Sequence, residues 1–142
     1  MLTYEEALQL VLTTVQPLPP VAVPLTSAAG RVLATAVIAG RNLPPSDNSA
    51  MDGYAFAWSE DIHEKPLAVI DFVAAGYARQ IPVPTGNAIK IMTGAPLPPN
   101  CDTVVPVEDV EIIDGRIQLK EKPTIGDNIR YCGEELRCGE LI

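Results

Sequence analysis

The apolar residues near the N-terminus recur at intervals of three and four positions, which is the spacing of one face of an α-helix. They are Tyr4, Leu8, Val11, Leu12 and Val15. Thr3 followed by Glu6 has the form of a capping box at the start of this helix, and Pro17, Pro19 and Pro20 end it. One helix cannot bury its own apolar face. We therefore expect this face to pack against another part of the protein, within this chain or beyond it.

Beyond Asn42 the apolar residues occur in short runs and alternations, which are typical of β-strands. Strands are expected near residues 54–58, 67–74, 88–92, 103–107 and 110–113, and two shorter ones earlier, at 21–23 and 31–37. Asp114-Gly115 between two apolar runs predicts a β-hairpin. Several strands at this spacing predict a small barrel or sandwich. The expected fold class is mainly β with an N-terminal helix (α+β).

The composition supports this picture. The 14 prolines among 142 residues argue against further long helices, and 47% apolar residues are enough for a core. The segment from Asn42 to Ser49 is rich in Pro, Asn, Asp and Ser, which indicates an ordered loop and a domain boundary.

The charge and the cysteines exclude several classes of function. A net charge of −8 repels phosphate backbones, so we expect no nucleic-acid partner. We also expect no membrane partner, because no apolar run approaches the roughly 18 residues of a spanning helix. The N-terminus is acidic where a signal peptide is basic, and the three cysteines form no CxxC pair, so the protein is expected to be cytoplasmic with reduced thiols.

The segment from Asp47 to Tyr54 is the first candidate for a site. It holds two carboxylates, an amide and a hydroxyl immediately before a predicted strand. Such a cluster can orient a polar substrate or hold a hard cation through oxygen ligands. The alternative is a turn in which Asp47 and Asn48 bond the nearby backbone and Gly53 supplies an unusual dihedral angle.

Two further loops are candidates. In Met92–Pro99, Gly94 has no Cβ to keep a ligand away from the backbone, but the loop is equally compatible with a simple strand exit. In the third loop, Gly126–Glu135, Arg130 can hold a carboxylate of a ligand in bidentate fashion. Its alternative role is an intramolecular salt bridge.

These loops carry a resemblance to a known family. Leu43-Pro44-Pro45 followed by Asp47–Ala55 resembles the signature of bacterial molybdopterin molybdenumtransferases (MoeA type) and of the E domain of gephyrin. A second block, Ile91–Pro98 with Asp102–Val105 and Glu108, is similar to that family as well. Further matches are Ala29–Ala34 before the first block, and Gly126–Arg130, Gly133–Glu135 and Gly139 after the second. The blocks occur in order over essentially the whole chain, which makes the resemblance specific.

The resemblance implies an elongated homodimer with several domains in each subunit. Residues 1–20 would form a helix that packs on a molybdopterin-binding domain, which is expected to follow Ile142. Residues 21–45 would be a linking segment of the elongated domain, and residues 46–140 an inserted small β-barrel-like domain. Residues 141–142 would begin the return into the linking segment.

The resemblance also implies a reaction in molybdenum cofactor biosynthesis. Molybdenum passes from molybdate to adenylylated molybdopterin, with release of AMP and a requirement for Mg²⁺. The cleft would lie between the later domain of one subunit and the inserted domain of its partner. Asp52 and Thr93 match the residues implicated in catalysis. The remaining candidates, as substrate-binding residues, are Asn48, Ser49, Gly94, Glu108, Arg130 and Glu135.

The charge of this chain indicates which parts of the substrate site it can supply and which must come from the rest of such an enzyme. Both substrates are anions, whereas this chain is acidic and has no Gly-rich phosphate cradle, so phosphate anchoring and the Mg²⁺ ligands are expected outside it. Asp52 would help to place Mg²⁺ or a water molecule, and Thr93 would donate a hydrogen bond. Glu135 occurs where many relatives carry Asp, which leaves its role open, and Glu108 is equally able to pair with Arg130 as scaffold.

Two hypotheses for the function follow. In the first, the chain is the N-terminal part of the enzyme, continues past Ile142 and is inactive alone. The alternative is a non-catalytic scaffold or interaction module of the same fold. The sequence that follows Ile142 separates the two hypotheses.

Overall fold

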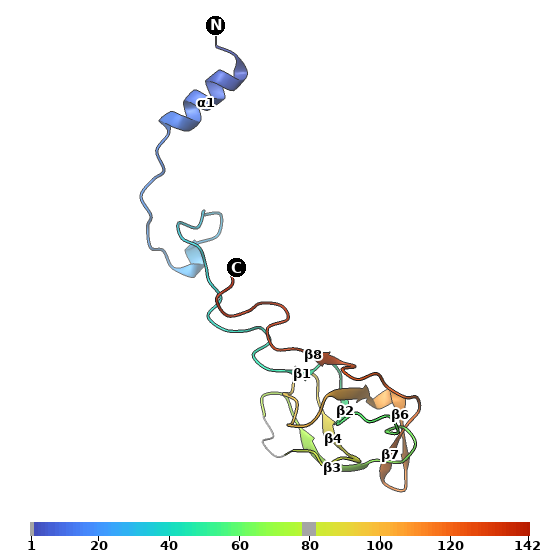
Figure 1. Ribbon diagram of the computed structural model, residues 1–142. Coiled ribbons are helices and arrows are strands. Elements are labelled where there is room, and N and C mark those ends of the chain that lie inside the picture. Colours follow the sequence, from blue (N-terminus) through green and yellow to red (C-terminus); the bar gives the residue numbers. More distant parts are fainter. Residues whose placement is uncertain (1, 78–81) are drawn as a thin grey trace. The chain divides into compact units, whose positions relative to one another are not determined.

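The computed structural model describes residues 2–77 and 82–142 (Figure 1). The chain forms two compact units, and the boundary between them along the sequence lies between Ala36 and Val37. The first unit holds helix α1 (Tyr4–Thr14) and the short 3₁₀ helix η1 (Leu25–Ser27). All strands belong to the second unit.

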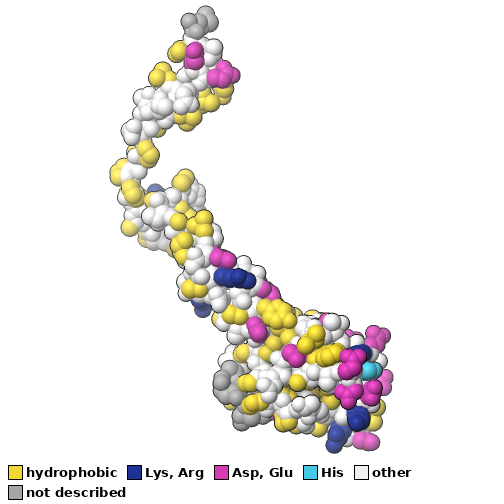
Figure 2. Space-filling view, in the orientation of Figure 1, with side chains coloured by type: hydrophobic (Ala, Val, Ile, Leu, Met, Phe, Trp, Pro, Cys, Tyr) yellow, Lys and Arg dark blue, Asp and Glu magenta, His cyan; other side chains and the backbone are white. Residues whose placement is uncertain are grey.

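Helix α1 begins at the predicted capping box. The Glu6 N–H donates to Thr3 Oγ1 at 3.2 Å, and the Thr3 N–H donates to Glu6 Oε2 at 2.8 Å. The predicted helix is thereby confirmed. No residue of α1 is buried, and its apolar side chains lie open on the surface in Figure 2. Among the described residues, every helix is too short or too polar to span a bilayer.

The two early strands were wrongly predicted: the structure describes residues 21–23 and 31–37 and has no strand in either. A strand is stable only when a neighbour accepts and donates its backbone hydrogen bonds. In this region Arg31 N–H donates to the Ala28 carbonyl in a local turn instead.

The core of the second unit is a four-stranded sheet in the order β3-β4-β2-β5. Its strands are β2 (Gly53–Phe56), β3 (Ala68–Val73), β4 (Asn87–Ile91) and β5 (Thr103–Pro106). β2 is antiparallel to both β4 and β5, whereas β3 runs parallel to β4 with a register irregularity between Val69 and Phe72.

Strand β2 is buried on both faces. Tyr54 and Phe56 belong to one hydrophobic cluster, and Ala55 belongs to a second cluster on the opposite face. The alternation of aromatic and small residues therefore separates two buried faces rather than a buried face from an exposed one.

The predicted hairpin is confirmed. β6 (Val110–Ile113) pairs with β7 (Arg116–Leu119), and Ile113 lies opposite Arg116. Asp114 and Gly115 connect them with φ angles of 50° and 75°. Positive φ angles at both residues let a two-residue turn match the right-handed twist of the flanking strands. The bridge between Leu67 and Ile117 joins the hairpin to the segment before β3, and η2 (Val107–Asp109) links β5 to β6.

The segments that enter and leave the sheet run antiparallel to each other. β1 (Asn48–Ser49) pairs with β8 (Ile129–Arg130), and the outgoing and returning chain meet again at Leu43–Leu136 and Ile38–Leu141 (Figure 1). The mainly β fold with one N-terminal α-helix is confirmed. The described residues form one four-stranded and two two-stranded sheets without a closed barrel, so the barrel-like form is not confirmed.

Gly53 gives a test of this packing. A Cβ at this position would overlap the Val105 carbonyl oxygen of β5, so we expect Gly53→Ala to lower the free energy of unfolding by about 2 kcal/mol or more. Gly40→Ala is the matched control, because a Cβ there meets nothing within 4 Å and the φ angle is not positive. Urea unfolding of both variants checks the prediction, and equal stabilities would contradict it.

Candidate functional site

The first two candidate loops lie against each other. Ser49 N–H donates to the Ala95 carbonyl at 3.0 Å, and Gly94 N–H donates to the Ser49 carbonyl at 2.8 Å. Leu97 N–H also donates to the Asp47 carbonyl at 3.0 Å. The loop that precedes β2 and the loop that follows β4 therefore form one hydrogen-bonded surface.

Asp52 and Thr93 are in direct contact on this surface. Asp52 Oδ1 accepts hydrogen bonds from the Thr93 backbone N–H and from the Thr93 hydroxyl, each at 2.8 Å. Both residues are exposed. Across residues 2–77 and 82–142, no hydrogen bond to Asp52 Oδ2 is found, so this second carboxylate oxygen is open to a ligand or to water.

The pKa of the Asp52 carboxyl lies below its ordinary value of 3.8. The chief cause is the Thr93 backbone N–H, followed by the Thr93 hydroxyl; burial opposes them by raising the pKa, and the charge of Lys90 lowers it by the smallest effect. Asp52 is therefore ionised at neutral pH. The Thr93 hydroxyl donates its hydrogen to Asp52, so in this arrangement its oxygen can only accept a further hydrogen bond, whereas the sequence led us to expect Thr93 to act as a donor.

Ser49 does not have the surface that a substrate contact needs. It is fully buried, its hydroxyl donates to the Met51 carbonyl at 2.6 Å, and the Met51 N–H returns a bond to Ser49 Oγ at 3.3 Å. The assignment of Ser49 to substrate binding is thus corrected to support of the turn.

Asn48 and Gly94 differ from Ser49 in exposure. Asn48 is half-buried, and its Oδ1 is buried without a hydrogen-bond partner among the described residues. Gly94 is exposed with φ of 78°, and the space that a Cβ would occupy is open to 4 Å. The backbone at Gly94 is therefore accessible to a ligand beside Thr93.

Arg130 forms the intramolecular salt bridge that was the alternative to ligand binding. Its Nε donates to Glu134 Oε1 at 2.7 Å, and its Nη2 pairs with Glu135 Oε1. Arg130 first, and then the Tyr131 N–H, holds the pKa of Glu134 below its ordinary value. In the register of β1 and β8, Arg130 lies opposite Asn48, which brings this ion cluster next to the first loop.

Glu108 lies apart from Arg130. It is exposed in η2, and its backbone carbonyl accepts from the Lys120 ammonium at 2.6 Å. The preceding residue, Val107, donates its N–H to the Asp52 carbonyl at 3.1 Å, so η2 borders the first loop. The suggested Glu108–Arg130 pair does not form.

Sequence reasoning missed the roles of Asp47 and Lys90. Asp47 Oδ1 accepts the Cys132 N–H at 2.8 Å and so ties the first loop to the returning chain. Lys90 is the one charged residue in the apolar strand β4, lies opposite Tyr54 and is exposed. A single charged residue within an apolar strand is the feature of the sequence that could have indicated a role for Lys90.

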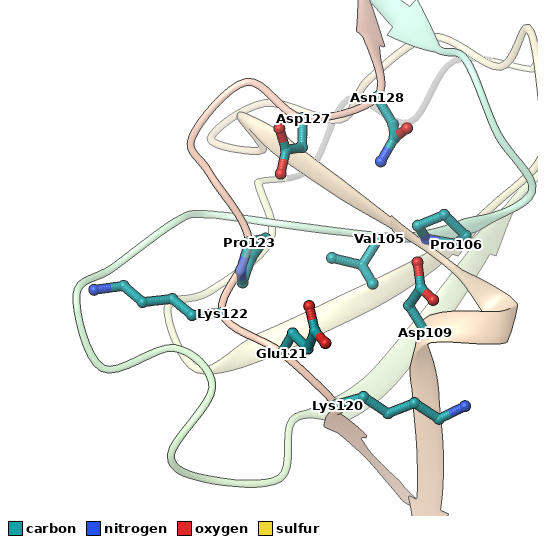
Figure 3. Close-up of a pocket in the computed structure, with 9 residues that line it drawn as sticks. All are labelled: Val105, Pro106, Asp109, Lys120, Glu121, Lys122, Pro123, Asp127 and Asn128. Atoms are coloured by element: carbon teal, nitrogen blue, oxygen red, sulfur yellow. The ribbon is translucent and has the colours of Figure 1, made fainter.

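A separate hollow of about 290 Å³ lies beside β5 and η2 (Figure 3). Val105, Pro106 and Pro123 supply apolar walls, while the ammonium ends of Lys120 and Lys122 extend to opposite sides. None of the eight predicted site residues lines it. Among the described residues, no group of three or more His, Cys, Asp or Glu side chains is placed to hold a metal ion.

The Asp52–Thr93 contact predicts a dependence of stability on pH. The folded state favours the Asp52 carboxylate, so its contribution is present above the ordinary pKa and is lost as the pH falls through the lower folded-state pKa. We expect the stability difference between the unchanged chain and Asp52→Asn to shrink over that range.

Thr93→Val removes the hydroxyl but keeps the backbone N–H, and it should raise the pKa of Asp52 in an NMR titration. An unchanged pKa in this variant would contradict the assignment.

Comparison with known proteins identifies the family. The family model described as the MoeA N-terminal region (domain I and II) matches residues 2–142. The protein named molybdopterin molybdenumtransferase from Haemophilus influenzae is 39% identical over 119 residues, which cover 83% of this chain and 30% of that protein. Its namesake from Synechococcus elongatus is 40% identical over 152 residues, covering 99% of this chain and 37% of that protein.

A solved structure shows the same relationship. The molybdopterin biosynthesis moeA protein from Pyrococcus horikoshii OT3 superposes with a TM-score of 0.87 at 34% identity, covering 98% of this chain and 38% of that chain. The chain thus spans about a third of the length of the curated relatives it matches. The resemblance carried by the loop motifs is confirmed, and the chain belongs to the MoeA family, whose N-terminal region (domain I and II) it matches.

Proposed function

We propose that this chain is the N-terminal part of an enzyme of molybdenum cofactor biosynthesis that transfers molybdenum from molybdate to adenylylated molybdopterin and releases AMP. Family membership supports the reaction class, because the relatives are named molybdopterin molybdenumtransferase. The observation that carries the proposal for this segment is the exposed Asp52–Thr93 pair.

The pair is suited to orientation of a polar group. Asp52 is ionised at neutral pH, and its Oδ2, which accepts no hydrogen bond from the described residues, can accept one from a water molecule or a substrate hydroxyl. The backbone of Gly94 lies beside Thr93 and leaves room for close approach. Groups held at the ends of strands by a hydrogen-bonded framework lower the entropic cost of reaching the reactive geometry.

The anionic substrates need positive charge that this acidic chain does not provide at the pair. Lys90 is the nearby cation that acts on Asp52, and Arg130 is already paired with two glutamates. We therefore assign phosphate and molybdate anchoring to the rest of the enzyme. Among residues 2–77 and 82–142, no group of three or more His, Cys, Asp or Glu side chains is placed to hold a metal ion. We therefore assign the Mg²⁺ ligands, too, to the rest of the enzyme.

The architecture of the whole enzyme is part of the proposal. Residues 46–140 form an inserted small β domain, residues 21–45 the linking segment, and residues 1–20 a helix for the molybdopterin-binding domain. In a cytoplasmic homodimer, the inserted domain of one subunit supplies one wall of the cleft of its partner. The antiparallel approach of outgoing and returning chain at Leu43–Leu136 supports an insertion at this point.

The first test compares the 142-residue chain with the full-length product of its gene. We expect molybdate-dependent AMP release from adenylylated molybdopterin with the gene product and none with the 142-residue chain. Full activity of the short chain would overturn the division of labour. An inactive gene product, measured beside an active relative, would overturn the proposed reaction.

The second test addresses the pair. In the full-length gene product, Asp52→Asn should lower kcat about 100-fold, because it removes the ionised carboxylate that orients the reacting group. Thr93→Val should lower kcat by about tenfold, the effect of one hydrogen bond. Asp114→Asn removes a carboxylate from the β6–β7 turn and keeps an Asn-Gly turn, so its kcat should not change. Equal rates for all three variants would contradict the role of the pair.

A further inference from the structure

Ser49 is hydrogen-bonded to the chain next to each member of the Asp52–Thr93 pair. Its side chain bonds the carbonyl and the N–H of Met51, which is the residue directly before Asp52. Its backbone bonds the Gly94 N–H and the Ala95 carbonyl, which directly follow Thr93. One buried residue thus contacts the chain beside both members of the pair.

We infer that Ser49 is a positioning residue for the Asp52–Thr93 pair: its buried hydroxyl closes the 49–51 turn and holds Asp52 against Thr93. The inference rests on the proposed function for its catalytic meaning. It names a role for Ser49 that excludes contact with substrate, since the residue has no exposed surface.

The geometry explains why the hydroxyl is needed. The backbone bonds of Ser49 fix the second loop relative to β1, and any residue other than proline can form them. The bonds to Met51 need a side-chain oxygen, because a single hydroxyl acts as donor at 2.6 Å and acceptor at 3.3 Å within two residues. Without that oxygen, two backbone groups of Met51 lose their partner and the turn that carries Asp52 loosens.

The test uses Ser49→Ala in the 142-residue chain, which removes only the oxygen. Thr103→Val is the matched control, because Thr103 is also fully buried and its hydroxyl bonds Asp102 rather than the turn before Asp52. Ser49→Cys retains a weak donor of similar size and should restore part of the effect.

Two NMR readouts report on the pair itself. In Ser49→Ala the pKa of Asp52 should rise towards its ordinary value, and the Thr93 amide should exchange with solvent roughly fivefold faster. Thr103→Val should leave both readouts unchanged. The inference is overturned if Ser49→Ala leaves them unchanged, if Thr103→Val moves them equally, or if both Ser49 variants unfold while Thr103→Val stays folded.

Kinetics of the full-length gene product separates this inference from the proposed function. If both hold, Ser49→Ala lowers kcat about tenfold with little change in KM, and Ser49→Cys recovers part of the loss. If the NMR readouts shift but Asp52→Asn retains full activity, Ser49 positions the pair and the proposed catalytic role of the pair fails. If Asp52→Asn is impaired while the NMR readouts of Ser49→Ala do not move, the positioning role alone fails.

Discussion

The burial of β2 on both faces is the constraint from which the rest of the second unit follows. Its four residues are buried between β4 and β5, and three of them, Tyr54, Ala55 and Phe56, contribute to two hydrophobic clusters. Gly53, the first residue of β2, permits the close approach of this strand to the Val105 carbonyl. Because Asp52 is the residue directly before it, the packing of the core decides where this carboxylate emerges.

The surface around Asp52 and Thr93 carries a carboxylate that is held by hydrogen bonds. The chain is acidic, yet the Asp52 carboxylate on this surface is held in a defined direction by hydrogen bonds. The two donors of Thr93 occupy one oxygen of Asp52 and leave the other open. The backbone bonds at Ser49 join the same two loops, so the pair lies on a surface held together by main-chain hydrogen bonds.

The polar residues around this surface divide into supporting and accessible groups. Asp47, Ser49 and the Arg130 cluster satisfy one another or the backbone, which is the usual state of polar groups in a packed structure. Asp52, Thr93 and Gly94 are exposed and adjacent. In the first unit, no residue of α1 is buried.

The sequence by itself determined the helix with its N-cap at Thr3 and the hairpin at Asp114-Gly115. The hydrogen bonds of both elements join residues that are close in the chain, so local interactions are enough to specify them. The loop motifs, which occur along the chain in the same order as in the family, were enough to identify the family. Only the tertiary structure decided that 21–23 and 31–37 are not strands, that both faces of β2 are buried, and that Ser49 is internal. The Asp52–Thr93 contact joins residues 41 positions apart, and the Asp47–Cys132 contact joins residues 85 apart. Such contacts depend on the packing of strands between them, and no local propensity specifies that packing.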